Sequence, residues 1–312
     1  MIAADDLAAP PARADAAPIY ALAPEPRGAG SWLAGRADGL YQQQLHGALA
    51  PDAGFPLAGT AVTALLEHEG WSYAAVPGGI LRGAGGGWLA APLATAPTVS
   101  ALCASRRRAG LLLAATLGDG VLRSEDSGAS WAAWNFGLLD RTVLALGLAL
   151  HGDAERLYAG TESGLFYSAT EGRSWAELFL PFAASVAALA VSADTLLAGS
   201  EGAGLWLRSL TVDEQRQGDG GVWRQIGEEA GDTIVAIVAV GAPDRPAALV
   251  LTPQRCFIWA GGATLRARAD APAGTELSCL AVSPAASGSW AVALGTRGGD
   301  IVQLHLRPEE LL

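Results

Sequence analysis

A short apolar pattern recurs seven times along the chain, and it constrains the fold more than any other feature of the sequence. Each copy is a mainly apolar run whose third residue is small, as in "VTALL" from Val62 and "VLALG" from Val143. The copies begin at residues 19, 62, 99, 143, 186, 234 and 277, at a spacing of about 43 residues. The small residue is alanine in six copies and Cys279 in the seventh. We therefore interpret Cys279 as a packing residue rather than a reactive thiol.

A β-hairpin signal follows most copies, as in "RLYAGTESGLFYS" (156–168), where two apolar runs flank a turn with glycine. A run led by tryptophan comes next, so each unit is predicted to hold four antiparallel strands, named A to D. Four-stranded units of about 40 to 45 residues are typical of propeller blades. Stacked blades bury both faces of each sheet, and a small residue in strand A fits the narrow axis. We predict an all-β fold, a seven-bladed β-propeller of four-stranded antiparallel blades. Residues 1–16 are expected to be a disordered lead-in and residues 17–312 a single domain.

Two octets stand out between the predicted C and D strands, "SEDSGASW" (124–131) and "SATEGRSW" (168–175). A short Asp or Ser side chain accepts hydrogen bonds from backbone N–H groups in a turn. Glycine occupies the turn position whose backbone conformation would strain other residues. The tryptophan then covers the hairpin with a large apolar ring. We predict a structural role, not a catalytic one, for the shared octet residues. They are Ser124, Asp126, Gly128, Ser130, Trp131, Ser168, Gly172, Ser174 and Trp175.

The octets resemble the Asp-box, or BNR, repeat of sialidase-like propellers, with a complete match at 124–131 and Thr170 in place of the Asp at 168–175. The resemblance implies two functional classes. A sialidase-like enzyme binds a carboxylated sugar with clustered arginines and uses a Tyr nucleophile assisted by Glu. The other class is non-enzymatic and includes assembly factors of membrane complexes, which carry a basic patch. The chain has no Arg-Ile-Pro entry motif, and no tyrosine is clearly placed beside a Glu at the pore.

We therefore expect a non-catalytic protein-interaction scaffold or a subunit of a larger complex. The alternative is a sialidase-like glycoside hydrolase or a glycan-binding module. In an antiparallel blade the B–C turns and D–A loops share one face of the ring. The predicted B–C turns place charged candidates for a ligand site at the pore mouth, namely Arg36, Asp38, Arg255, Arg297 and Asp300.

Two D–A loops on that face, 134–142 and 176–185, carry large apolar residues, which either pack on the neighbouring blades or form an exposed interface. We predict a docking site there, around the junctions of blades three, four and five, with an acidic rim that favours a basic or mixed apolar protein partner. Its candidate residues are Phe136, Leu138, Leu139, Phe179, Leu180, Phe182, Asp119, Glu162 and Glu201.

Charge and composition bear on the kind of partner, on membrane insertion, on disulfides and on the location of the protein. The net charge of −11 argues against a nucleic-acid partner, and the basic run "SRRRAG" (105–110) is interpreted as a solvated turn. The best candidate for a membrane span is the uncharged run 178–193, which contains Pro181 and is too short to cross a bilayer. The acidic start resembles no signal peptide, and three distant cysteines form no disulfide framework. We expect a cytoplasmic protein without metal or cofactor, whose ring is closed by a short or irregular segment.

Overall fold

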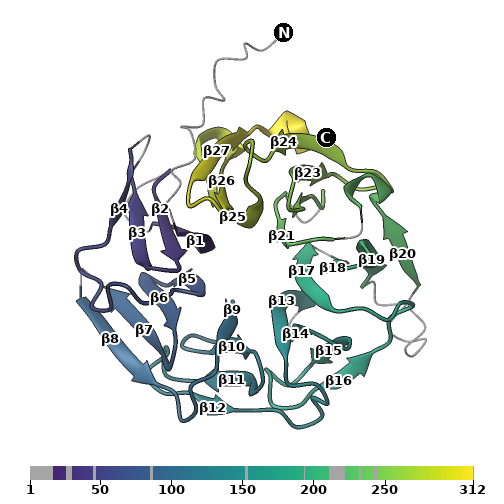
Figure 1. Ribbon diagram of the computed structural model, residues 1–312. Helices are drawn as coiled ribbons and strands as arrows, with labels where there is room; N and C mark the ends of the chain where they lie inside the picture. Colours follow the sequence, from purple (N-terminus) through teal and green to yellow (C-terminus); the bar gives the residue numbers. More distant parts are fainter. Residues whose placement is uncertain are drawn as a thin grey trace.

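The chain folds into a ring of β-sheets around a central axis in the computed structural model (Figure 1). The structure describes residues 17–311, except 26–29, 45–46, 85–86, 152–153, 193, 211–221, 232 and 242–244. The predicted all-β, seven-bladed propeller is confirmed. Within each blade the strands run antiparallel and in sequence order from the axis to the rim. The predicted lead-in, residues 1–16, lies outside the described residues.

Strands A and B are the two inner strands of each blade; strands B such as β10 and β22 are fully buried, whereas strands A such as β5 and β9 are partly exposed at the axis. Strands A are β1 (Ile19–Pro24), β5 (Ala64–His68), β9 (Val99–Ala104), β13 (Val143–His151), β17 (Val186–Ser192), β21 (Ala236–Ala239) and β25 (Leu277–Pro284). Strands B are β2 (Trp32–Arg36), β6 (Trp71–Val76), β10 (Leu112–Thr116), β14 (Ala154–Thr161), β18 (Thr195–Ser200), β22 (Ala248–Leu251) and β26 (Trp290–Thr296).

The two outer strands, C and D, complete the blades. Strands C are β3 (Gly39–Gln43), β7 (Gly79–Ala84), β11 (Gly120–Ser124), β15 (Leu165–Ser168), β19 (Leu205–Ser209), β23 (Arg255–Trp259) and β27 (Ile301–Leu306). Strands D are β4 (Leu49–Pro51), β8 (Gly87–Pro92), β12 (Ala132–Ala133), β16 (Ala176–Leu178), β20 (Trp223–Ile226) and β24 (Arg266–Asp270). Short 3-10 helices are η2 (Glu228–Ala230), η3 (Ala286–Gly288) and η4 (Pro308–Leu311).

The hydrophobic core lies between blades rather than in one central cluster. Tyr73 and Ile80 of blade two pack against Leu112 of blade three, for example, and Leu113 of blade three packs against Leu157 of blade four. Each sheet therefore buries both faces against its two neighbours. This explains why strands such as β10 are buried at every residue instead of alternating.

Glycines in strand B allow the next blade to come close. A Cβ atom added to Gly35 would lie 2.7 Å from the carbonyl oxygen of Val62, and one added to Gly160 would lie 2.4 Å from that of Val186. The same approach lets the Val62 N–H donate to the Arg36 carbonyl over 2.9 Å. Val62 thus bonds to blade one, and β5 begins two residues later at Ala64, the third residue of the run that starts at Val62.

Blade seven meets blade one at the axis and closes the inner part of the ring. The Ser278 hydroxyl donates to the Ile19 carbonyl over 2.6 Å, and Gln303 Nε2 donates to Gln43 Oε1 over 2.8 Å. Among the described residues, blade seven has only β25, β26 and β27. The expected closure of the ring by a short or irregular segment stays a prediction.

Candidate functional site

The two octets form matching turns between strands C and D. In blade three, Ser124 Oγ accepts a hydrogen bond from the Gly128 N–H over 2.8 Å, and Asp126 Oδ1 accepts one from the Ser130 N–H over 2.9 Å. Although partial burial opposes ionisation, hydrogen bonds from Ser130 and Ser124 lower the pKa of Asp126 to about 2. The arrangement is a turn whose polar groups bond to one another.

The second octet makes the same contacts with a hydroxyl in place of the carboxylate. Ser168 Oγ accepts from the Gly172 N–H over 3.0 Å, and Thr170 Oγ1 accepts from the Ser174 N–H over 2.9 Å. Trp175 is buried, and its indole N–H donates to the carbonyl of Trp134 in blade three over 3.0 Å. The Trp175 ring therefore ties two blades together, whereas Trp131 of the first octet is partly buried.

Each octet is also held by an arginine from the preceding blade. Arg82 of β7 donates to the Ser127 carbonyl over 3.0 Å, and Arg123 of β11 donates to the Glu171 carbonyl over 2.9 Å. Ser127 and Glu171 occupy the same octet position, with φ of 55° and 56°. This left-handed conformation aims each carbonyl at the neighbouring blade. This contact is not predicted from the sequence; its only signal there is that Arg82 and Arg123 occupy the same position of strand C.

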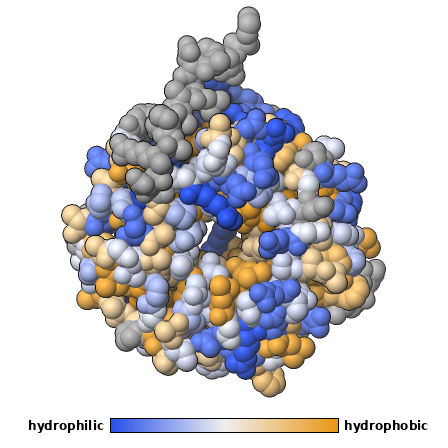
Figure 2. All heavy atoms as spheres, viewed as in Figure 1, coloured by the Kyte–Doolittle hydropathy of each residue, from blue (hydrophilic) through white to orange (hydrophobic). Residues whose placement is uncertain are grey.

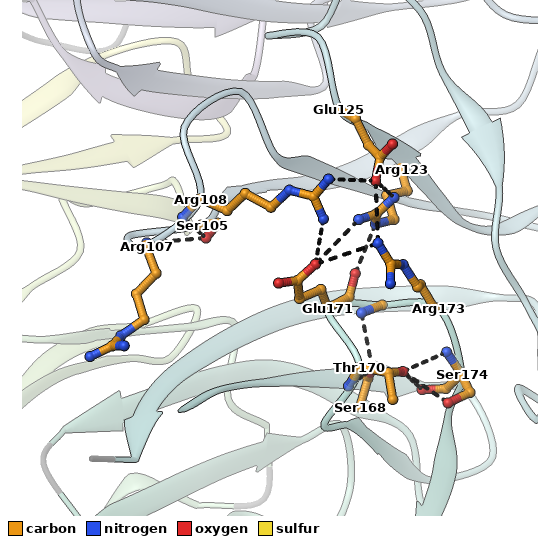
Figure 3. Close-up of polar contacts among 11 residues, drawn as sticks. Ser105, Arg107, Arg108, Arg123, Glu125, Ser168, Thr170, Glu171, Arg173 and Ser174 are labelled. Carbon is orange, nitrogen blue, oxygen red and sulfur yellow. Dashed lines mark hydrogen bonds and ion pairs between the residues drawn. The ribbon is translucent and has the colours of Figure 1, made fainter. Parts of the chain in front are cut away.

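Five charged side chains gather beside the octets of blades three and four (Figure 3). This arginine–glutamate cluster consists of Arg108, Arg123, Arg173, Glu125 and Glu171. Arg108 donates to Glu125 over 2.9 Å and to Glu171 over 2.5 Å. The hydrogen bond from Arg123, followed by attraction to the surrounding arginines, lowers the pKa of Glu125. The basic run 105–110 is thus more than a solvated turn, because Arg108 links two blades.

The pore-mouth arginines each face a carboxylate of their own blade. Arg36 lies 3.0 Å from Asp38 and over the ring of Tyr41 at 4.2 Å. Arg297 lies 3.3 Å from Glu276. Arg255 pairs with Asp270, and the Asp300 N–H donates to Thr296 over 3.0 Å. Figure 2 shows an opening at the centre of the ring, bordered by hydrophilic and hydrophobic residues. Because carboxylates of the protein already face these arginines, the arginines are poorly suited to bind a carboxylated sugar.

The predicted apolar docking residues divide into exposed and buried ones. Phe136, Leu139 and Phe179 are exposed by 81%, 80% and 66%. The prediction that Leu138 belongs to an exposed patch is wrong, because Leu138 is only 4% exposed and lies in the core between blades three and four. The turn at Gly137, with φ of 81°, directs Leu138 inward and Leu139 outward.

Leu180 and Phe182 are partly buried rather than freely exposed. Leu180 packs on the core cluster of blades four and five, and the ring of Phe182 stacks on Trp206 of β19 with centroids 4.8 Å apart. The carbonyl of Phe179 accepts a bond from the indole of Trp223 in blade five over 2.8 Å. The loop after β16 therefore bridges two blades and leaves Phe179 as its most exposed ring.

The exposed rings lie along the rim of the propeller. The Trp175 N–H donates to the Phe136 carbonyl over 2.8 Å, so Phe136 lies beside the outer strand of blade four. The strands flanking these rings, β12, β16 and β20, follow one another along the periphery (Figure 1). Of the predicted acidic residues, Asp119 accepts a hydrogen bond from Thr95, whereas Glu162 and Glu201 are exposed.

One carboxyl group is strongly perturbed by its surroundings. Burial is the main cause that raises the pKa of Glu67 to about 7; Ser72 opposes the shift by a hydrogen bond, and the charge of Glu25 adds to it. Glu67 Oε2 is buried without a hydrogen-bond partner among the described residues. Perturbed carboxyls of this kind occur at active sites and also in structural positions.

We expect the Glu67→Gln variant to be more stable than the parent by about 1–2 kcal/mol near pH 8 and to have no such advantage near pH 4.5. The folded pKa of about 7 lies above the ordinary value of 4.5. The folded state therefore keeps a proton that the unfolded chain releases, and this contribution to stability is lost as the pH rises through 7. Urea unfolding at both pH values measures it; an equal difference at both would contradict the assignment.

The part of the chain that the structure describes holds neither a candidate metal site nor a cysteine with a lowered pKa. No group of three His, Cys, Asp or Glu side chains there could hold a metal ion. Burial raises the pKa of Cys103, Cys256 and Cys279 to about 12, so these thiols stay protonated at neutral pH. No described helix has the length and apolar character that a membrane span requires.

The chain matches no protein-family model and no curated protein sequence. Its fold is similar to that of YCF48 bound to D1 peptide, with a TM-score of 0.67, 13% identity and coverage of 93% of this chain and 92% of that one. It is also similar to the GH74 xyloglucanase from Xanthomonas campestris, with a TM-score of 0.68, 18% identity and coverage of 92% of this chain and 52% of the enzyme.

A third similar structure is the extracellular domain of a protein assigned to a one-component system of B. thetaiotaomicron. Its TM-score is 0.67 at 15% identity, over 93% of this chain, and the chain spans 38% of its length. These neighbours include enzymes and non-enzymes, and at such identities they share the fold alone. The chain is thus a seven-bladed β-propeller of the architecture found in the YCF48 and GH74 proteins.

Proposed function

We propose that this protein is a non-catalytic β-propeller that binds another protein, as a scaffold or as a subunit of a larger complex. The observation that carries the proposal is the set of large, exposed apolar side chains on consecutive blades, Phe136, Leu139 and Phe179. Exposed apolar side chains that gather in one patch are typical of interaction surfaces. YCF48, a propeller of nearly the same length, binds a peptide and supports the idea by analogy.

The docking surface is the rim of blades three and four, which carries these three residues together with half-exposed Trp134. Because Phe136 and Phe179 already use their backbone carbonyls to bind tryptophans of the next blade, the rings are held on rigid supports. A preorganised aromatic side chain loses little entropy on binding, which suits it as an anchor.

The charge of the protein favours a basic partner. The net charge is −11, and exposed Glu177 lies two residues from Phe179. Complementary charge at the edge of an interface mainly speeds association and selects partners. We therefore propose that the partner is a protein with a basic or mixed apolar surface and not a nucleic acid.

The contacts of the two octets further support their assignment to the Asp-box type, with a structural role.

We expect the combined variant Phe136→Ala and Phe179→Ala to weaken partner binding at least about tenfold while the melting temperature stays within about 2 °C. Both rings are exposed, so their removal opens no cavity in the core. The tagged parent and variant are used as baits in extracts of the source cells. Prey bound by the parent is identified by mass spectrometry, and its affinity for both baits is then measured.

Leu138→Ala is the matched control, because this side chain is buried next to the docking surface. We expect it to lower stability by about 2–3 kcal/mol, through a cavity in the core, with little effect on the affinity of the folded fraction. If the double variant unfolds, its rings belong to the core and the docking surface does not exist. If it stays folded and binds its partner normally, the partner uses another face.

A glycoside hydrolase remains the second candidate, favoured by the GH74 neighbours alone. The chain covers about half of their length, 44% and 52%, and the pore-mouth arginines are paired within their own blades. Incubation of the pure protein with sialosides and xyloglucan distinguishes the candidates. Turnover that disappears in Arg297→Ala would favour the enzyme over the scaffold.

A further inference from the structure

The outer strand of blade two is the longest outer strand among the described residues. β8 spans six residues, whereas the other outer strands span two to five. It lies on the periphery of the ring, where its inner side pairs with β7 (Figure 1). No described strand pairs with its outer side. β8 therefore presents an open sheet edge.

The backbone groups that face outward on this edge follow from the pairing with β7. The Leu93 N–H donates to the Gly78 carbonyl over 3.3 Å, so these two residues form a hydrogen-bonded pair just beyond the strand. Such pairs alternate with non-hydrogen-bonded ones along an antiparallel ladder. Trp88 and Ala90 are in the non-hydrogen-bonded pairs, so their N–H and C=O groups point away from β7. No described group is hydrogen-bonded to them.

The edge of β8 has little protection against pairing with another chain. Folded proteins guard such edges with charged side chains, with proline or by keeping the strand short. Glu177 in β16, Arg224 in β20 and Arg266 in β24 are charges of this kind. β8 reads "GWLAAP", contains no charged residue and has its only proline, Pro92, at the end. Leu89, near the middle of the strand, is 57% exposed.

The edge is complementary to itself. Two copies of β8 that run antiparallel about a two-fold axis at Leu89 place Trp88 of each copy opposite Ala90 of the other. The outward N–H and C=O groups of both residues are then all paired. A register shifted by two residues would instead set Trp88 opposite Pro92, which has no N–H to donate. At the axis the two Leu89 side chains meet across a non-hydrogen-bonded pair, where side chains lie closest.

We propose that two copies of this chain form a two-fold dimer in which the outer edges of β8 pair antiparallel with Leu89 at the axis. A two-fold interface uses the same surface of both chains, as this edge allows. The uncharged strands bring no like charges into contact, although each chain has a net charge of −11. The docking surface of blades three and four stays free, so the dimer presents it twice and can bind a partner with two sites more tightly.

Sedimentation velocity tests the dimer directly. We expect a monomer–dimer equilibrium with a Kd on the order of 10 μM, because one pair of edges buries a small interface. Raising the salt concentration from about 0.05 M to about 0.5 M should strengthen the dimer, because salt screens the repulsion between two acidic chains. A parent chain that stays monomeric at about 200 μM would overturn the proposal.

A disulfide tests the register. Leu89→Cys places two thiols opposite each other at the axis, where Cα atoms are about 4.5 Å apart and a disulfide fits. Ala90→Cys is the matched control, because its two thiols are not opposite each other. Under mild oxidation the first variant should form a linked dimer at least about tenfold faster. The native thiols are buried with pKa values of about 12 and compete little. Equal rates would indicate random collision and contradict the register.

Opposite charges at the axis give a second test of the same register. Leu89→Asp and Leu89→Lys should each weaken the dimer at least about tenfold, because like charges then face each other. Mixing the two variants should restore a dimer, now with one copy of each. Leu89→Thr is the neutral control and should stay within about threefold of the parent. If both charged variants dimerise like the parent, the copies meet through another surface and the proposal is wrong.

A proline tests the backbone pairing. Because the Ala90 N–H points away from β7, Ala90→Pro removes an outward donor and leaves the pairing within blade two intact. The loss occurs twice in a two-fold dimer, so the Kd should rise at least about tenfold. The Phe136→Ala and Phe179→Ala double variant should dimerise like the parent, which separates this interface from the docking surface. A dimer unaffected by Ala90→Pro, in a variant that melts like the parent, would rule out pairing through β8.

Discussion

The Gly160→Ala variant is expected to lose about 3 kcal/mol of unfolding free energy, although it adds only one methyl group. The added Cβ would lie 2.4 Å from the Val186 carbonyl oxygen and 2.8 Å from its Cγ1. The oxygen belongs to the backbone of β17, which is paired with β18 and packed between two blades. Because the backbone cannot turn aside as a side chain can, the two blades have to separate.

Gly164→Ala is the matched control in the same blade. Nothing lies within 4 Å of its added Cβ, so the substitution meets open space. We expect no loss, or a gain of up to about 1 kcal/mol, from the reduced entropy of the unfolded chain. Urea unfolding followed by tryptophan fluorescence compares the two variants. Equal stability would show that blades four and five can shift apart at little cost, contrary to the close packing described above.

The number of blades is predictable from the sequence because every copy of the repeat needs the same residue types at the same positions. A small residue in strand A and a glycine turn after strand B are short-range features, and they recur wherever blades converge on the axis. Cys279 illustrates this, since its sulfur lies 4.0 Å from the Ile19 carbonyl and a Cβ on Gly295 would come within 2.5 Å of it. The packing interpretation of Cys279 rests on this same crowding.

The exposure of loop residues was not predictable in the same way. Leu138 and Leu139 are identical neighbours, yet one is 4% and the other 80% exposed. Their directions depend on a turn in which the Leu138 N–H donates to the Asn135 carbonyl over 3.0 Å and Gly137 has φ of 81°. That turn is positioned by Trp175 of the next blade, whose N–H bonds to the loop. A pattern read within one loop contains no information about this contact.

The arginine–glutamate cluster was missed because it joins turns that are distant in sequence. Arg123 donates to the carbonyl of Glu171, which lies 48 residues further along the chain, and Arg108 donates to the carboxylate of Glu171 over 63 residues. Each octet was therefore interpreted as a turn that stabilises only its own hairpin. The structure shows that the octet of blade four also accepts a hydrogen bond from Arg123 of blade three, at the carbonyl of Glu171.

Arg123→Met is expected to lower the unfolding free energy by about 2 kcal/mol. The Arg123 side chain is only 1% exposed and donates to Glu125 and to the Glu171 carbonyl. Methionine keeps much of the apolar stem but leaves both acceptors without this donor. Since Glu125 and Glu171 are 49% and 40% exposed, water replaces part of the loss, and the effect stays below that of a fully buried pair.

Comparison with Arg173→Met separates the effect of burial from that of charge. Arg123→Met and Arg173→Met each remove one positive charge from the same cluster, but only Arg123 is buried. Arg173 is 52% exposed and lies 3.7 and 3.9 Å from the two glutamates, so we expect a change within about 0.5 kcal/mol. Urea unfolding at low and high salt measures both variants. If they are equally destabilised, and salt removes both effects, the cluster acts through its net charge. A large loss for Arg123→Met that persists in salt means that this arginine, by holding the left-handed Glu171 carbonyl, joins blades three and four.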